Sequence, residues 1–209
     1  MRRYECASFN LSLDSNADDV AGRLGSLSRK ASLVMSRAIN RTTGHVKTRM
    51  KEEAVKRYHV KAQKVSGTIS VSKKATAGSP SARILSIGQH PNLISFDVSP
   101  KRAVRTLKSG KRSPGVYLAS VEKDSGRKPL AGRNKPFIME PKNGGIAVFR
   151  RMTEAEKSKH SNSKTGLIGV GGPAIPQMIK NKDIMNKVSE GANEMMAKRL
   201  DHEIKRILG

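Results

Sequence analysis

The chain has 209 residues, a length that predicts one domain with at most an appended arm. Aromatic residues make up only 3% and tryptophan is absent, so we expect a modest, aliphatic core. Lys and Arg number 41 against 17 Asp and Glu, and the net charge of +24 favours a polyanion or an acidic protein surface as partner. No stretch reaches the roughly 18 apolar residues of a membrane-spanning helix. No signal peptide is expected, because no apolar run follows the first residues.

The charge is concentrated in the middle of the chain. Residues 41–135 hold 22 of the 41 basic residues but only five of the 17 acidic ones. An anionic partner is therefore expected to meet this central region. The single cysteine, Cys6, excludes an internal disulfide and suits a reducing cytoplasm.

The N-terminal part predicts a strand followed by a long helix. Alternating apolar residues within an N-terminal arm, residues 1–14, predict a short edge strand. Ser15 and Asp18 then approximate a capping box. Apolar residues recur every three or four positions after it, which predicts one long helix, or two nearly collinear ones, from about residue 17 to about residue 56. Gly44 is the expected break, because a helical glycine costs ~1 kcal/mol relative to alanine.

The stretch 31–61 of this helix combines an apolar face with a basic face. The basic face consists of Arg37, Arg41, Lys47, Arg49, Lys51, Lys56 and Arg57. Such a helix can anchor a core and offer cations to a partner at once. The alternative is a core helix whose cations are only solvated.

Short elements are predicted in the centre of the chain. A short helix is expected within residues 58–68. Strands are expected over residues 68–71, 82–87 and 93–98 from their β-type composition and alternation. Glycine, proline and asparagine separate the last two strands, which favours a hairpin between them.

The next part alternates between loops and strands. Residues 116–123 alternate as a strand. Residues 136–139 and 146–149 flank Lys142-Asn143-Gly144-Gly145, whose Asn and Gly tolerate the positive φ of a tight turn, so a hairpin is expected there. Flexible loops are predicted over residues 100–114, 124–135 and 152–166.

The C-terminal part predicts a rigid turn at residues 171–178 and a second amphipathic helix. Apolar residues from Ile184 to Ile207, Met195 among them, trace its buried stripe. Helices at both ends with strands between them predict an α+β fold. In this fold the long N-terminal helix and the C-terminal helix pack on a small antiparallel sheet that carries long basic loops.

Several short motifs, taken in order, carry a resemblance to a known family. They are Ala38-Ile39-Asn40-Arg41-Thr42, Lys47-Thr48-Arg49, Tyr58-His59-Val60-Lys61-Ala62, Ser81-Ala82-Arg83-Ile84, Gly115-Val116, Phe137-Ile138, Asn143-Gly144, Val148-Phe149-Arg150-Arg151 and Gly172-Pro173-Ala174-Ile175-Pro176-Gln177-Met178. From about residue 30 to the end, the chain resembles the phage minor tail protein Z family, the tail-completion proteins of long-tailed phages. It departs from the family pattern in the loops around residues 127–134 and 158–165.

The resemblance implies a single tail-completion-like domain over residues 1–209 and a structural role in the virion. Such a protein is assembled in the host cytoplasm and completes the head-proximal end of the tail, so that the tail joins the filled head and lets DNA pass. The resemblance also implies a homo-oligomeric ring, preferably a hexamer. Its expected partners are tail terminator, tail tube, tape measure or head connector proteins, and genomic DNA in the channel, with no membrane.

No motif predicts an enzyme, a metal site or a cofactor. The five histidines lack metal-ligand spacing. Gly110-Lys111 is followed by Arg112 where a phosphate loop needs Ser or Thr. The glycines at residues 169–172 precede Pro173, which removes an N–H donor, so a structural turn is favoured. Cys6 has no evident base beside it. The resemblance adds no catalytic residue either.

The basic loops are the functional candidates. No aromatic residue interleaves with their cations, which argues against stacking on single-stranded bases. Phosphate contacts of this kind are non-specific and salt-sensitive. Alternatively, the loops pair with acidic neighbouring subunits, or the chain is a general non-specific nucleic-acid-binding protein. The candidate contacts with DNA or an acidic partner are Lys101, Arg102, Arg105, Lys108, Lys111, Arg112, Arg127, Lys128, Arg133 and Lys135.

Overall fold

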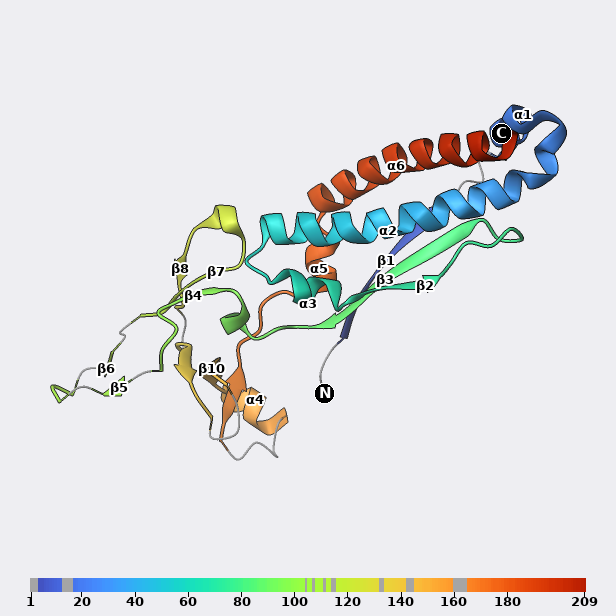
Figure 1. Ribbon diagram of the computed structural model, residues 1–209. Helices are drawn as coiled ribbons and strands as arrows, with labels where there is room; N and C mark the ends of the chain where they lie inside the picture. Colours follow the sequence, from blue (N-terminus) through green and yellow to red (C-terminus); the bar gives the residue numbers. More distant parts are fainter. Residues whose placement is uncertain are drawn as a thin grey trace. The chain divides into compact units, whose positions relative to one another are not determined.

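The chain forms two compact units in a computed structural model (Figure 1). The structure describes residues 4–12, 17–103, 105–106, 108–110, 112–113, 116–131, 134–141, 145–159 and 165–209. Unit 1 consists of Met1–Val55, Lys61–Gln89 and Ile175–Gly209, and unit 2 of Lys56–Val60 and His90–Ala174. Helices and small antiparallel sheets confirm the predicted α+β class. The single domain over residues 1–209 stays a prediction.

Unit 1 holds the long elements of the chain. Two of its helices have 27 residues each, and two of its strands have nine. The elements are β1 (Tyr4–Ser12), α1 (Ala17–Leu24), the 3-10 helix η2 (Gly25–Lys30), α2 (Ala31–Arg57, whose last two residues belong to unit 2), α3 (Ala62–Ser66), β2 (Ile69–Lys73), β3 (Ser81–Gln89), α5 (Ile175–Ile179) and α6 (Lys182–Leu208).

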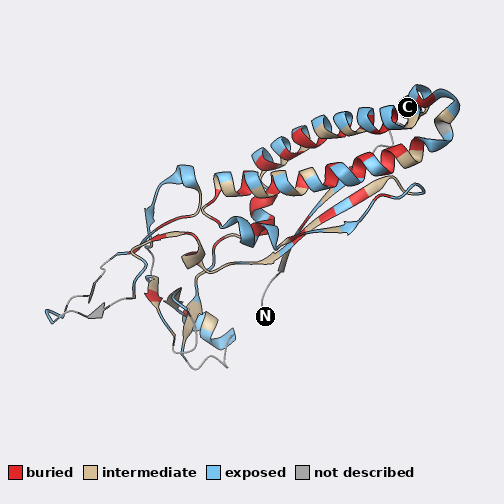
Figure 2. Ribbon diagram, in the orientation of Figure 1, coloured by how far each residue is buried: buried red, intermediate tan, exposed pale blue. Residues whose placement is uncertain are grey.

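The apolar stripe of α2 forms the centre of unit 1, as its spacing predicts. Buried positions recur along one side of the helix (Figure 2). Fully burying a side chain such as Ile39 stabilises the fold by roughly 1.5–3 kcal/mol. The buried apolar residues of α2 are Ala31, Val34, Met35, Ala38, Ile39, Val46, Met50 and Ala54.

Helix α6 packs beside α2, also as predicted. Its buried side chains follow a four-residue spacing from Ile184 to Ile204. Two members of the predicted stripe are wrong: Met195 and Ile207 are only half-buried, and Met196 is buried in place of Met195. Thr42 on α2 donates a hydrogen bond to Met196 Sδ over 3.6 Å, which places the two stripes in contact.

Ion pairs fix the antiparallel register of α2 and α6. Glu203 on α6 is fully buried and lies 3.5 Å from Arg41 Nε on α2. Further along, Lys187 Nζ on α6 lies 3.7 Å from a carboxylate oxygen of Glu53 on α2. Residue numbers rise along α2 as they fall along α6, so the helices run in opposite directions. A shift in this register would leave the buried Glu203 without its partner on α2, which is costly.

The helix break lies at Gly25, and the predicted break at Gly44 is wrong. Gly25 has φ of +53°, which a glycine adopts without strain, and it ends α1 before the 3-10 helix η2. Gly44 lies inside α2 with no neighbouring atom near its missing side chain. Its cost of about 1 kcal/mol is tolerated because the surrounding stripe is buried.

The sheet of unit 1 has the strand order β1-β3-β2. β1 confirms the predicted N-terminal edge strand, and it pairs antiparallel with β3 over its whole length, from Tyr4↔Gln89 to Ser12↔Ser81. One face of β3 is buried through Ala82, Ile84 and Ser86. The opposite face of β3 is more accessible. It follows that the helices cover one side of this sheet.

Unit 2 is built from short elements. Its longest strand has five residues. The elements are η3 (Leu93–Ser95), β4 (Asp97–Ser99), β5 (Arg105–Thr106), β6 (Arg112–Ser113), β7 (Leu118–Ser120), η4 (Lys123–Ser125), β8 (Lys128–Pro129), β9 (Phe137–Met139), β10 (Ala147–Arg151), α4 (Glu154–Lys159) and β11 (Leu167–Gly169). They form sheets of order β4-β7-β8, β11-β10-β9 and β5-β6.

Several predictions for unit 2 differ from the structure, and one of its hairpins is confirmed. Residues 93–98 do not form a strand hairpin with 82–87, because β4 pairs with β7 and residues 93–95 form a 3-10 turn. The loops predicted over 124–135 and 152–166 contain β8 and α4, respectively. The hairpin of 136–139 with 146–149 is confirmed by the pairing of β9 with β10, although its turn at 142–144 lies outside the described residues.

Candidate nucleic-acid interface

The functional candidates lie in residues 101–135, here called the basic segment, which belong to unit 2. Asn92 links η3 and β10, two elements of the unit that carries this segment. Its side-chain amide donates to Val148 O and accepts from Val148 N, each over 2.9 Å, and it also accepts from Ile94 N over 3.1 Å. Asn92 thereby binds the backbone of β10 at Val148, just beyond the residues that pair with β11, and caps η3.

A buried aromatic side chain also packs within unit 2. Phe96 is almost fully buried against Gly172. A Cβ atom on residue 172 would lie only 2.3 Å from Phe96 Cε2. Glycine is therefore required at this position for close packing rather than for a phosphate-binding loop.

The backbone at the start of the basic segment is held by a hydrogen bond from Tyr117. Tyr117 is buried next to β7, and its hydroxyl donates a hydrogen bond to the carbonyl oxygen of Arg102 over 2.7 Å. Burial raises the pKa of the Tyr117 hydroxyl, so it remains a donor at neutral pH. The backbone of Arg102 is thus anchored while its side chain remains exposed.

Arg127 is tied to Asp97 instead of standing free for a partner. Its Nε and Nη2 donate to the two carboxylate oxygens of Asp97 over 2.7 and 3.1 Å. This bidentate pair lowers the pKa of Asp97, with smaller contributions from the charges of His59 and Lys101. The pair connects β4 to the turn before β8, so part of the charge predicted for a polyanion is already neutralised inside unit 2.

The structure brings some of the predicted contact residues together. Lys101 and Arg102 follow β4, and Lys128 lies on β8 of the same three-stranded sheet. Lys135 lies apart from them, two residues before β9 of the second sheet. The predicted contact residues with exposed side chains are Lys101, Arg102, Lys108, Lys128 and Lys135, together with the paired Arg127.

Residues 100–114, predicted as a flexible loop, contain a short antiparallel hairpin. Arg105 lies on β5 opposite Ser113, and Arg112 lies on β6 opposite Thr106. Exposed Lys108 lies between the two strands, in the connecting residues. Lys111 and Arg133, also predicted contacts, lie outside the described residues. Residues 101–113 contain six Lys and Arg and no acid, so this hairpin is strongly cationic.

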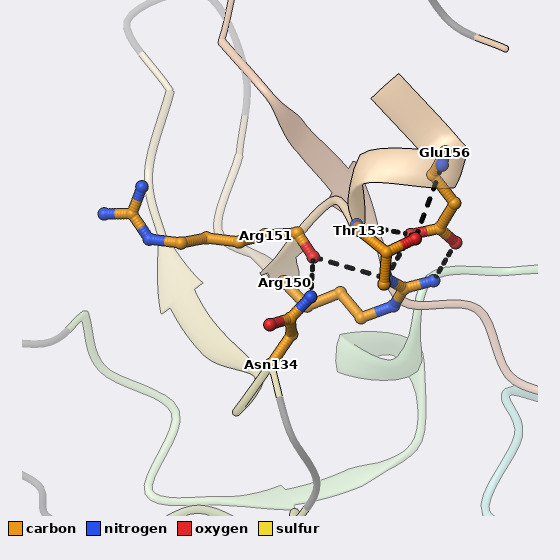
Figure 3. A network of polar contacts seen from close by, with 5 residues as sticks. All are labelled: Asn134, Arg150, Arg151, Thr153 and Glu156. Carbon is orange, nitrogen blue, oxygen red and sulfur yellow. Dashed lines mark hydrogen bonds and ion pairs between the residues drawn. The ribbon is translucent and has the colours of Figure 1, made fainter. Parts of the chain in front are cut away.

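Figure 3 shows a second polar network that sequence reasoning missed. Arg150 on β10 makes a bidentate pair with Glu156 on α4, with N···O distances of 2.7 and 2.5 Å. Thr153 N donates to Glu156 over 2.9 Å, and Glu156 N donates to Thr153 Oγ1 over 3.3 Å. These reciprocal bonds are a capping box, and the Thr-x-x-Glu spacing was the signal that predicts α4.

This network changes the charge available beside the sheet. Hydrogen bonding to Arg150, followed by the Thr153 backbone, lowers the pKa of Glu156 to about 2. Arg150 is therefore neutralised, whereas the Arg151 side chain extends away from the network (Figure 3). Arg151 is exposed, and its carbonyl oxygen accepts a hydrogen bond from Asn134 over 3.0 Å. It is an additional candidate contact that the charge pattern of the sequence did not single out.

The candidate site consists mainly of cationic side chains. No cluster of three His, Cys, Asp or Glu residues able to hold a metal occurs in the described part of the chain. None of the helices within that part is long and apolar enough to cross a membrane. The arrangement suits attraction to phosphates or to carboxylates of another protein.

Comparison with known proteins identifies the family. The model of the family described as prophage minor tail protein Z (GPZ) matches residues 17–209. No significant match was found among curated proteins or among solved structures. The family match spans every element from α1 to α6 and confirms the resemblance seen in the sequence motifs. The chain therefore belongs to the prophage minor tail protein Z family and is a structural protein of a phage tail.

Proposed function

We propose that this protein completes the head-proximal end of a phage tail, where it forms an oligomeric ring that supports head–tail joining and DNA passage. The family match over residues 17–209 carries the proposal, because it assigns the chain to the tail of a virion. The role is structural rather than catalytic, and it needs no cofactor.

The basic segment supports a contact with DNA. Exposed lysines and arginines follow β4, flank the β5–β6 hairpin and lie on β8. Contacts of such cations with phosphates are independent of base sequence, which allows DNA to move past them. The weak grip that results suits a channel better than a site that must recognise one sequence.

The ring is proposed as a homo-oligomer, preferably a hexamer. Its neighbours are the tail terminator, tail tube, tape measure or head connector proteins, whose acidic surfaces would complement a chain of charge +24. In this arrangement the basic segment meets DNA on one side of the ring and acidic subunits on another.

Gold-labelling of particles tests the position. A tag is added after Gly209, beyond the exposed Leu208 at the end of α6, and purified particles are viewed by electron microscopy. Label at the head–tail junction is expected. Label at the distal tip, or along the tail, would overturn the proposed position while leaving the family unchanged. A tagged tail tube protein serves as the control for label along the tail.

The strongly cationic hairpin also favours a second function, non-specific nucleic-acid binding by the free chain. This function predicts tight, salt-dependent binding to duplex DNA outside the particle. The two functions separate in a lysate of infected cells. A tail protein sediments with particles, whereas a general nucleic-acid-binding protein remains in the soluble fraction with DNA or RNA.

A further inference from the structure

Strand β1 leaves one edge of the unit 1 sheet open (Figure 1). All nine of its residues pair with β3 on one side, and within the described residues no strand pairs with its other side. Proteins usually protect such an edge with Lys, Pro, a bulge or a short strand. β1 has none of these devices, and Glu5 is its charged residue. By contrast, β2 at the opposite edge has five residues, a bulge and Lys73.

The register shows which backbone groups of β1 face outward. Ile87 N on β3 donates to Thr68 O over 3.0 Å, so Ile87 directs its backbone groups away from β1. Its neighbour Ser86 therefore faces β1, where it is paired with Ala7. Alternation along β1 then turns the N–H and C=O groups of the intervening residues to the open edge, and these residues are Cys6, Ser8 and Asn10.

Two copies of β1 are complementary when they run antiparallel. The midpoint of Tyr4–Ser12 is Ser8, which is one of the residues whose backbone faces outward. When two copies are related by a two-fold axis at Ser8, all nine residues of each strand lie opposite residues of the other. The residues whose backbone faces outward then form hydrogen-bonded pairs across the axis. In this register Cys6 lies opposite Asn10 of the second copy, and Ala7 lies opposite Phe9 of the second copy.

A cavity lies beside β1 at the position of that pair. It is open to solvent and is lined by Ala7, Ser8, Phe9 and Lys180 together with residues of α2, β3, α5 and α6. Phe9 is only half-buried in the single chain. In the full-overlap register, Phe9 of each copy lies next to the small Ala7 of the other, at the wall of this cavity. Pockets for alternate side chains are what give strand addition its specificity.

Charge favours this edge as the contact between copies. Two chains of charge +24 repel each other wherever basic surfaces meet. β1 carries no Lys or Arg between Tyr4 and Ser12. The strand next to it contributes Arg83, which already donates a hydrogen bond to Asn10 Oδ1 over 3.1 Å. β1 itself therefore brings no cation to the contact, and the cation that lines the cavity beside it is Lys180.

We propose that the free protein forms a two-fold dimer in which β1 of one copy pairs antiparallel with β1 of a second copy about Ser8. The result is a continuous six-stranded sheet of order β2-β3-β1-β1-β3-β2. This contact closes at two copies, so it is separate from the head-to-tail contacts that a ring requires. The dimer goes beyond the proposed function and does not depend on it.

Light scattering coupled to size-exclusion chromatography tests the dimer with the full chain. The wild-type mass is expected to be twice that of one chain. Ser8→Pro removes an outward N–H that β3 does not use, and is expected to halve the mass. Ser8→Ala keeps that N–H and is expected to remain dimeric. A wild-type monomer, or a Ser8→Pro dimer, would overturn the proposal. Circular dichroism checks that both variants keep their helices.

Disulfide crosslinking tests the register and remains decisive if Ser8→Pro does not fold. In the double variant Cys6→Ser/Ser8→Cys, the new thiols face each other at the two-fold axis, and mild oxidation is expected to give a covalent dimer. In wild type, Cys6 is four residues away from its symmetry mate, about 13 Å along the strand, and is expected not to crosslink. Crosslinking through Cys6 without crosslinking through Ser8→Cys would contradict this pairing.

Discussion

Units 1 and 2 are stabilised in different ways. Unit 1 has long helices and strands whose regular stripes bury side chains such as Ile39 and Val188 completely. Unit 2 has strands of two to five residues, and side-chain bonds from Asn92, Tyr117 and Asp97 hold them in place. Periodic burial therefore maintains the frame of the protein, while a few polar contacts position the basic segment.

This difference has a consequence for function. Elements held by few contacts open at lower free energy than a packed core. Unit 2 can therefore adjust its cationic hairpin to a partner at little cost, while α2 and α6 keep their register. The proposed contact with DNA or an acidic protein uses the part of the chain that depends least on the core.

The largest expected effect follows from a cavity in unit 1. Ile39→Ala removes a fully buried side chain from α2 and is expected to lower the free energy of unfolding by about 2–5 kcal/mol. Denaturant unfolding followed by circular dichroism measures the loss. Ile87→Ala is the control, because Ile87 is 47% exposed and its removal should change stability by about 0.5 kcal/mol or less. Equal losses of unfolding free energy in the two variants would show that the buried stripe of α2 does not stabilise unit 1 more than an exposed position does.

A smaller loss, confined to unit 2, is expected for Asn92→Ala. The change leaves the backbone N–H of buried Val148 unpaired, at a cost of about 1–3 kcal/mol, while the C=O of Val148 keeps its bond from Val170 N. Hydrogen exchange should show faster exchange in β10 with little change in α2. Asn134→Ala, which removes one exposed bond to Arg151, is the matched control. Faster exchange throughout α2 would contradict the separation between the units.

Substitutions in the basic segment and in unit 1 should change the salt dependence of DNA binding to different extents. Lys101→Ala, Lys108→Ala and Lys128→Ala are each expected to reduce the slope of log K against log salt for duplex DNA, by about 0.9 for each phosphate that the variant no longer neutralises. Lys198→Ala removes the same charge from an exposed position on α6 and should leave that slope nearly unchanged. Fluorescence anisotropy at several salt concentrations measures both. An equal reduction for all four would show that net charge, not the basic segment, governs binding.

The smallest effect is the pH response of the capping network. The pKa of Glu156 is lowered from 4.5 to about 2, so its stabilising interaction with Arg150 is fully present above pH 4.5 and disappears as pH falls through about 2. Arg150→Gln should raise this pKa toward 4.5, because the guanidinium is the largest cause of the shift. A carbon NMR titration of the Glu156 carboxyl group measures both values. An unchanged midpoint in Arg150→Gln would show that the guanidinium does not cause the shift.

The sequence predicts unit 1 better than unit 2, for a physical reason. A stripe such as that of α6 is local, because its buried residues recur every four positions. The pairing of β1 with β3 joins residues from Tyr4↔Gln89 to Ser12↔Ser81, far apart along the chain, so no local pattern indicates it. Residues 93–98 alternate like a strand, yet the Asn92 side chain caps a 3-10 turn at their start.

The candidate site was predictable only in its composition. Counting lysines and arginines located the basic segment, and exposure of Lys101, Lys108 and Lys128 agrees with that count. The pairing of Arg127 with Asp97, 30 residues away, required the fold. The Thr-x-x-Glu spacing at Thr153 was a local signal for α4 that the polar composition of the stretch obscured.

The central claim is that the basic segment meets DNA in the assembled particle. Photocrosslinking in filled particles tests it most directly, with a diazirine-bearing lysine analogue at Lys108 in the hairpin and, as a control, at Lys198 on α6. The account predicts a crosslink between residue 108 and DNA, and a much weaker one from residue 198. Crosslinks from residue 108 to protein alone would contradict it and show that the cations pair with acidic neighbours instead.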